Sequence, residues 1–386
     1  MIYIIVLIYT LFLFFRYNVG KKKKGEKFHY YFLLFIVICI TGFSYRLGMD
    51  TIGYSENFER LDDFNTVIHH LNGYRYEPAF VLLLSLCKSI WNDFAMVQIV
   101  VALFVNTTIF WFAKKHSNYY FLAIFLFFIY DFWNFNFEIK RESIAVSFFL
   151  LGIHHLLKEK VVAKDYIVYY IFSAFCFAFH HFGILTIFFP LLMRIRMNKV
   201  YYTAFIIIFL VSLFGSMFLK DTLVAINQLM ALYTGEDITT YMESGKYGEG
   251  SFYTINGLIT ALVIPLYIVY SIKDRIDKKI LALTLFTFII SLLSSQVFII
   301  YRLQNYFCMF LFITYSRFAE VSCSSRSGRA SINRLILIFV IFVVMYGKCH
   351  KSQYIRYAPY SSIFTKEINR EREAEFDRLA TEYLYY

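Results

Sequence analysis

Long apolar runs separated by short basic links constrain this chain more than any other feature. The first run, Ile2–Phe15, is followed directly by Lys21–Lys24, and this alternation recurs along most of the sequence. A helix needs about 17–25 apolar residues to cross a bilayer, where only helices and closed barrels satisfy their own backbone. Because 59% of the 386 residues are hydrophobic, the sequence predicts an all-α, polytopic integral membrane protein.

The distribution of basic residues predicts the orientation of the spans. The formal net charge is +11, but Lys and Arg gather in the short links, as in cytoplasmic loops under the positive-inside rule. Nucleic-acid binding is therefore not expected. With these links in the cytoplasm, we expect about 11–12 membrane-spanning helices. The candidate spans are Ile2–Phe15, Phe28–Phe43, Phe94–Ala113, Tyr119–Trp133, Ser143–Leu157, Tyr166–Phe179, Phe182–Met193, Tyr201–Leu219, Ile255–Ile272, Ile280–Ile300, Asn305–Phe318 and Leu335–Gly347.

Two segments depart from this pattern. Ala79–Trp91 is short, contains Lys88 and follows Pro78. We therefore expect a helix that lies in the interface on the outer side of the membrane and does not cross it. The pair His180-His181 separates two short apolar halves. This spacing predicts a tight hairpin with the two histidines at its tip, on the outer side.

The predicted organisation is one transmembrane domain over residues 1–347, with outer loops at 44–78 and 220–254. A polar tail with a helical pattern follows at 348–386. The acidic residues 371, 373, 375 and 377 of this tail alternate, so on a helix they point in different directions and indicate a solvated face rather than a metal site. The six cysteines form no CxxC pair, which argues against a disulfide framework or a zinc site.

A set of ionisable residues maps to the outer side of the predicted membrane. Ionisable groups beside apolar spans are costly to place and are functional-site hypotheses by default. Their one-sided placement predicts chemistry at the outer membrane–water boundary, on an anionic, lipid-borne substrate. The set comprises Arg46, Asp50, Glu77, Arg141, His180, His181 and Arg302.

These residues belong to short motifs with a recognisable order. R-x-G-x-D-x-x-x-Y covers residues 46–54, E-P covers 77–78, R-E-x-I-A covers 141–145, the histidine pair follows, and R-x-x-x-Y-F covers 302–307. In this order the chain resembles the EpsG-like branch of the Wzy-type polysaccharide polymerases, over roughly residues 30–310. Glu142 stands where that family usually has Gln. Phe182 and Gly183 replace the usual Ser or Thr two residues after the histidine, so which histidine corresponds stays open.

The resemblance implies a glycosyl transfer at the outer face of the bacterial inner (cytoplasmic) membrane. A growing glycan on undecaprenyl pyrophosphate would be moved to a hydroxyl of the next lipid-linked repeat unit. The guanidinium fork of arginine suits a pyrophosphate leaving group, and a positioned base assists the hydroxyl. The expected roles are pyrophosphate binding for Arg46, Arg141 and Arg302, catalysis for His180, His181, Asp50 or Glu77, and sugar contact for Tyr54 and Tyr306. Among the catalytic candidates we favour His180 as the base, because its ordinary pKa of about 6.5 suits proton transfer near neutral pH.

Other function classes stay open at this point. A glycan ligase would use similar residues, whereas a flippase or transporter would show internal repeats and a polar site near the bilayer midplane. A scaffold of a biosynthetic complex would leave the outer arginines without a role. The outer loops contain no DxD motif, so we expect a metal-independent transferase without a cofactor. Its expected partners are lipid-linked oligosaccharide, membrane lipid, and other polysaccharide export and chain-length proteins.

Overall fold

The computed structural model describes residues 2–196, 198–214, 263–294, 301–325, 327–348 and 354–384. Within these residues the regular structure is helical and no β-strand forms. The predicted all-α membrane fold is thereby confirmed. The predicted outer loop 220–254 lies outside the described residues.

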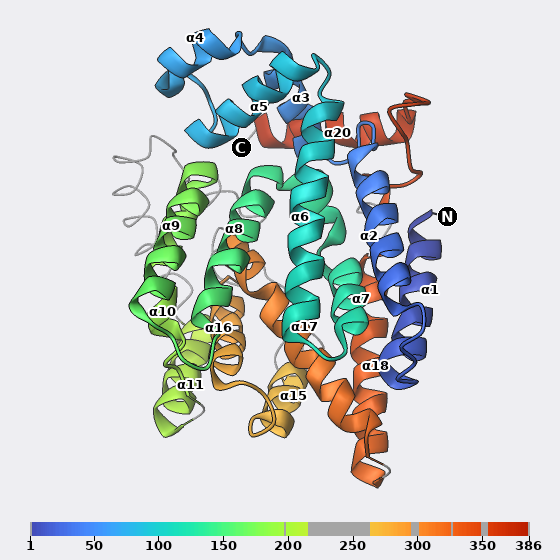
Figure 1. Ribbon diagram of the computed structural model, residues 1–386, viewed down its shortest axis with the longest axis vertical. Helices are drawn as coiled ribbons and strands as arrows, with labels where there is room; N and C mark the ends of the chain where they lie inside the picture. Colours follow the sequence, from blue (N-terminus) through green and yellow to red (C-terminus); the bar gives the residue numbers. More distant parts are fainter. Residues whose placement is uncertain are drawn as a thin grey trace. The chain divides into compact units, whose positions relative to one another are not determined.

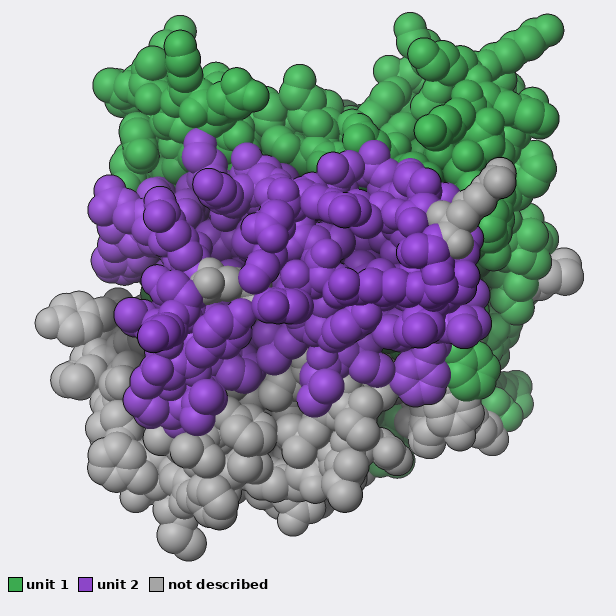
Figure 2. Space-filling model, turned by 90° about the horizontal axis from the view of Figure 1, so that it is seen from below, with its two compact units in different colours: residues 1–187, 341–381 green, residues 188–340, 382–386 purple. Residues whose placement is uncertain are grey.

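The chain divides into two compact units, which Figure 2 colours separately. Unit 1 comprises residues 1–187 and 341–381, and unit 2 comprises residues 188–340 and 382–386. All but one of the motifs noted above lie in unit 1. The R-x-x-x-Y-F motif at 302–307 lies in unit 2.

One set of helices runs along unit 1, and a second set gathers at one end of it (Figure 1). The first set comprises α1 (Ile2–Leu13), α2 (Glu26–Gly42), α6 (Ala95–His116), α7 (Tyr120–Tyr130), α8 (Lys140–Leu156) and α9 (Ala163–Phe179). The others are α3 (Met49–Arg60), α4 (Phe64–His69), α5 (Pro78–Ile90) and α20 (Arg370–Leu384). We call the end where α3, α4, α5 and α20 lie the site end. The basic links after α1, α6 and α8 lie at the opposite end (Figure 1), which agrees with the charge pattern.

Apolar side chains face outward on unit 1, as in a protein surrounded by lipid. Ile2–Val19, Ala95–His116 and Gly328–Met345, which begins in unit 2 and ends in unit 1, are long and apolar enough to cross a membrane. On α2, Phe28 and Phe35 are 66% and 63% exposed. A contiguous apolar surface of this kind is not left open to water by soluble proteins.

Helix α5 has the properties of a non-spanning helix. Its 13 residues cover about 20 Å at 1.5 Å per residue, whereas the hydrocarbon core is about 30 Å thick. It lies with α3 and α4 at the site end (Figure 1). Lys88, near its end, donates to three carbonyl oxygens at the C-terminus of α3: Phe58 (3.0 Å), Glu59 (3.0 Å) and Leu61 (2.7 Å). The Lys88 side chain therefore caps α3, which compensates its charge beside the apolar helix.

The predicted hairpin at the histidine pair is present, but the segment that follows the histidines is not the regular helix that was expected. Helix α9 ends at Phe179, and His181–Phe188 form a 3₁₀ helix (η4) instead of a regular span. Gly183 explains the tightness, because a Cβ at this position would collide with the backbone of Cys176 in α9. Glycine lets the two backbones approach where any side chain would separate them.

Unit 2 has its own packed core. Its helices are α10 (Phe189–Leu192), α11 (Lys199–Phe214), α15 (Ile264–Ile272), α16 (Lys278–Ser294), α17 (Tyr301–Cys323) and most of α18 (Gly328–Lys348). Tyr201 of α11 packs in this core and its hydroxyl donates to the carbonyl of Leu285 in α16 (3.0 Å). Thr284 and Thr314 join α16 to α17 by a hydroxyl pair 2.8 Å apart.

The C-terminal tail packs onto the site end of unit 1. The guanidinium of Arg372 in α20 is buried and donates to the backbone carbonyls of Ile355, Pro359 and Arg46. The amide of Tyr45 donates to the carbonyl of Ser361 (2.9 Å), which lies in the loop before α20. These bonds give hydrogen-bond partners to loop carbonyls that no helix would satisfy. They also place the tail beside the first motif.

Candidate functional site

The first motif begins with a backbone turn that only glycine fits well. Gly48 has a φ of 82°, and a Cβ there would collide with the carbonyl of Phe137. The hydroxyl of Thr51 donates to that same carbonyl, and the amide of Asp50 donates to Oε2 of Glu138 at 3.0 Å. The start of α3 is therefore fixed on the π-helical turn Asn134–Glu138 (η3), which precedes α8.

Asp50 and Glu138 form a pair of neighbouring carboxyl groups at this junction. Glu138 lies in the link between α7 and α8 and accepts hydrogen bonds from the Asp50 amide and, at 2.9 Å, from the hydroxyl of Tyr357. Burial, and secondly the negative charge of Asp50, raise the pKa of Glu138 to about 7. A carboxyl that keeps its proton near neutral pH is a feature of functional sites as well as of buried networks.

Arg141 opens α8 and is held in a box of aromatic and acidic groups. Its Nη1 donates to Oε2 of Glu77 at 2.5 Å, and its Nε lies 3.5 Å from the hydroxyl of Tyr54. The guanidinium lies 4.6 Å from the ring centroid of Tyr76. The side chain of Arg141 keeps 17% of its surface exposed, against 2% for Glu77. The box therefore orients the guanidinium while leaving part of it open.

Glu77 joins three segments that are far apart in sequence. It precedes Pro78 at the start of α5, binds Arg141 of α8, and accepts the backbone amide of His181 through Oε1 at 3.2 Å. The ring Nδ1 of His181 lies 3.9 Å from the same Oε1. One buried carboxylate thus brings together an arginine and a histidine, both predicted from sequence as site residues. We call Glu77, Arg141 and His181 the Glu77 junction.

The two histidines of the hairpin tip have different environments. His180 is buried, and its Nε2 lies 3.9 Å from Oε2 of the buried Glu142. The side chain of His181 is 33% exposed and belongs to the Glu77 junction. The glutamate at position 142 therefore faces His180, and His181 is the more exposed of the two histidines.

Arg46 has a different partner from Arg141. Its Nε and Nη2 donate to Oε1 and Oε2 of Glu373 at 3.0 and 2.5 Å, a bidentate ion pair with α20. Glu373 is expected from the sequence to lie on a solvated face of the tail. In the structure it instead forms an ion pair with Arg46. A role for Arg46 in pyrophosphate binding stays a prediction, and it requires exchange of this carboxylate for phosphate.

The two predicted sugar-contact tyrosines are buried. Tyr54 is 4% exposed and packs against Tyr76 and Phe80, with ring centroids 5.4 Å away in each case. Tyr306 is fully buried in unit 2, with its ring centroid 6.1 Å from that of Phe189. Both therefore act as packing groups in this conformation, and sugar contact by either stays a prediction.

Arg302 lies in the first turn of α17, in unit 2, and is partly exposed. A clamp shared by Arg46, Arg141 and Arg302 stays a prediction. Among the described residues, no three His, Cys, Asp or Glu side chains gather as possible metal ligands.

The comparison with protein families decides the family. The model of the EpsG family matches residues 27–362, most of the chain. The chain belongs to the EpsG family. Membership favours a role of the polysaccharide polymerase type. No curated protein and no solved structure gave a match.

Two site residues of this EpsG-family protein were missed by the sequence argument. Tyr76 stacks on Arg141, and Glu138 receives the amide of Asp50. Glu138 carries a detectable signal, because it is a charge next to the outer end of an apolar run, the same criterion that selected Arg141. Tyr76 carried none, since its neighbour Glu77 drew attention only through the following proline.

Proposed function

We propose that this EpsG-family protein polymerises lipid-linked oligosaccharide repeat units at the outer face of the bacterial cytoplasmic membrane. The observation that carries the proposal is the Glu77 junction, which combines the partly exposed Arg141 and His181 at one end of unit 1. An arginine suits a diphosphate leaving group and a histidine suits proton transfer from a hydroxyl. Membership of the EpsG family, which favours a role of the polysaccharide polymerase type, supports the proposal.

In the proposed reaction, an acceptor hydroxyl attacks the anomeric carbon of the growing glycan. The bond from that carbon to the pyrophosphate oxygen breaks, and undecaprenyl pyrophosphate leaves with the electron pair. A guanidinium has five N–H donors, and the bonds of Arg141 to Glu77 and Tyr54 use two of them. The remaining edge can bind the leaving oxygens as their charge grows, which lowers the barrier.

We assign the role of base to His181, in place of His180, which the sequence argument favoured. The imidazole takes the proton of the acceptor hydroxyl, and the carboxylate of Glu77, 3.9 Å from Nδ1, stabilises the imidazolium that forms. His180 faces the buried Glu142 instead. The greater exposure of His181 supports this choice, because a base has to come within hydrogen-bond reach of the substrate.

The test is deletion of the gene in its native host, with the surface glycan separated by size on a gel. A polymerase deletion leaves single repeat units attached to the cell surface, and wild-type protein supplied in trans restores long chains. Loss of all exported repeat units would instead indicate a flippase, and long chains confined to the lipid carrier would indicate a ligase. Either of these two results would overturn the proposal.

A matched pair of variants links the phenotype to the site. Arg141→Ala, expressed at the wild-type level, should fail to restore long chains. Arg275→Ala removes an exposed arginine that follows α15 in unit 2 and should restore them. Normal chain length with Arg141→Ala would separate the function from this site.

A further inference from the structure

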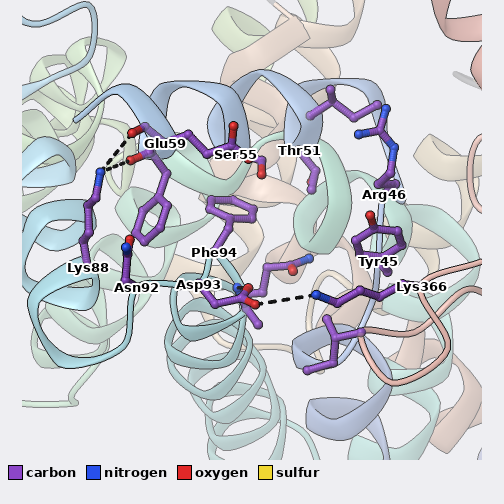
Figure 3. A pocket seen from close by; sticks show the side chains of 15 residues that line it. Tyr45, Arg46, Thr51, Ser55, Glu59, Lys88, Asn92, Asp93, Phe94 and Lys366 are labelled. Atoms are coloured by element: carbon purple, nitrogen blue, oxygen red, sulfur yellow. Dashed lines mark hydrogen bonds and ion pairs between the residues drawn. The ribbon is translucent and has the colours of Figure 1, made fainter.

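A cavity lies at the site end of unit 1, and its lining contains none of the residues of the Glu77 junction. It has a volume of about 420 Å³, within the range of small-molecule sites. Residues from α3, from the link between α5 and α6, and from the loop before α20 line it (Figure 3). The lining residues that bear on its chemistry are Tyr45, Ser55, Asn92, Asp93, Phe94 and Lys366.

The cations around this cavity are already compensated. Lys88 binds three carbonyls at the end of α3, and Arg46 binds Glu373. Lys366 reaches toward Asp93, with Nζ 4.0 Å from Oδ2 (Figure 3), and Glu59 adds a further carboxylate to the wall. With Arg46 held by Glu373, the other two lining cations, Lys88 and Lys366, are balanced by Glu59 and Asp93. In this conformation the cavity therefore has no excess positive charge to attract a diphosphate.

The remaining lining suits an uncharged ligand with many hydroxyl groups. Ser55, Asn92 and Asp93 supply a hydroxyl, an amide and a carboxylate to its wall, which are donors and acceptors for sugar hydroxyls. Phe58 and Phe94 pack edge to face, with centroids 5.8 Å apart, and give the wall an apolar part. Sugar rings combine these two characters, since hydroxyl groups surround faces of C–H bonds.

Helix α3 separates this cavity from the Glu77 junction. Tyr54 contacts Arg141, whereas the next residue, Ser55, lines the cavity. Successive residues on a helix point in different directions, and a helix with its side chains is about 10 Å across. The two sites therefore lie on different faces of α3, about one helix diameter apart, a distance that a few linked sugars can span.

We propose that the cavity binds an uncharged segment of the glycan, belonging either to the acceptor repeat unit or to the growing chain. The identity of the glycan rests on the proposed function, whereas its binding is measured without catalysis. Occupation here holds the polymer away from the pyrophosphate site and aligns the reacting ends, which favours transfer over loss of the chain.

The test uses full-length protein in lipid nanodiscs carrying Ser55→Cys, a nearly isosteric change in the cavity wall. Mass spectrometry of the labelled peptides separates position 55 from the native cysteines. The probes are fragments of one, two and three repeat units cut from the host's own surface glycan, free of lipid and phosphate. We expect them to slow maleimide labelling of Ser55→Cys about tenfold at ten times their Kd. The control, Ser89→Cys, is exposed on α5 outside the cavity, and its labelling should not change.

Fragment length distinguishes the two sources of sugar. Equal protection by one and three units assigns the cavity to the acceptor unit, and protection that grows with length assigns it to the growing chain. Inorganic pyrophosphate should not protect. Protection by pyrophosphate alone, or no protection by any fragment, overturns the proposal even if gene deletion abolishes long chains. Protection in a host whose deletion leaves chain length normal would reject the polymerase function and retain the glycan site.

A second variant checks the consequence of filling the cavity. Ser55→Trp should reduce fragment affinity at least about tenfold and shorten the glycan made in the host, whereas Ser89→Trp should do neither. Unaltered fragment affinity in correctly inserted Ser55→Trp would place the glycan elsewhere.

Discussion

Oε2 of Glu142 lies 3.9 Å from Nε2 of His180, with both side chains buried. The family to which the motifs point usually has Gln at this position, and the glutamate provides a polar group that faces the ring. Glu142→Gln should therefore keep chain length and thermal stability close to wild type. Glu142→Ala should lower the free energy of unfolding by about 1–3 kcal/mol, since a buried polar contact is lost. Thermal unfolding in nanodiscs measures the difference, and equal stability of both variants would contradict a role for this contact.

A conservative change tests whether the arginines bind phosphate or only anchor the protein to headgroups. Lysine keeps the charge and loses the fork, so a bidentate site does not tolerate it. Arg141→Lys should reduce polymerisation about 10²–10³-fold, as loss of a transition-state donor does, and Arg302→Lys should behave alike. Arg194→Lys and Arg275→Lys are the controls, because both residues are exposed. Gel analysis of glycan length at matched protein levels decides, and full activity of Arg141→Lys would remove Arg141 from the mechanism.

Much of this architecture could be predicted from local patterns, because membrane spans, basic links and a hairpin at His180-His181 depend on residues close in sequence. The pairing of Glu77 with Arg141 could not, since it joins residues 64 positions apart and neither side chain reveals its partner. The contact of Arg372 with the carbonyls of Ile355 and Pro359 likewise needs the folded tail. Charge beside an apolar run identifies a candidate residue, whereas its partner depends on tertiary packing.

Substitution of the two histidines separates the assigned base from its neighbour. His181→Ala should lower the transfer rate about 10²–10⁴-fold, the usual contribution of general base catalysis, with normal insertion into the membrane. His180→Ala should act mainly through stability, because its ring is buried beside Glu142. Transfer rates with lipid-linked repeat units, together with unfolding midpoints, distinguish these effects. If His180→Ala alone abolishes transfer in a stably folded protein, the roles are reversed; if neither matters, Asp50 or Glu77 is the better candidate.

The raised pKa of Glu138 predicts a dependence of stability on pH. Burial, and then the charge of Asp50, raise it to about 7 from an ordinary value of 4.5, so the folded protein retains a proton that the unfolded chain loses above about pH 4.5. Its contribution to the free energy of unfolding is present below pH 4.5 and is lost as pH rises through 7. Glu138→Gln should flatten the fall in unfolding midpoint between pH 5 and 7.5. Glu56→Gln, at an exposed position of α3, should leave it unchanged, and an unchanged slope in Glu138→Gln would refute the shift.

The tail and the first motif meet at Arg46, so the two possible roles of this arginine can be separated. The Arg46–Glu373 pair is about one third exposed, with side-chain exposures of 36% and 26%, and a pair of this kind contributes at most about 1 kcal/mol. Arg372→Ala should cost more, about 1–3 kcal/mol, because buried carbonyls lose their donor, and amide hydrogen exchange should rise across α20. Glu373→Gln should leave α20 in place and glycan length normal. If Arg46 binds substrate phosphate, Arg46→Lys shortens the glycan in the wild-type protein and also in Glu373→Gln. The reason is that the Glu373 carboxylate binds Arg46 only when no substrate is present, so its removal does not replace the arginine. A normal glycan from Arg46→Lys would leave Arg46 with the tail contact as its role and confine anion binding in unit 1 to Arg141.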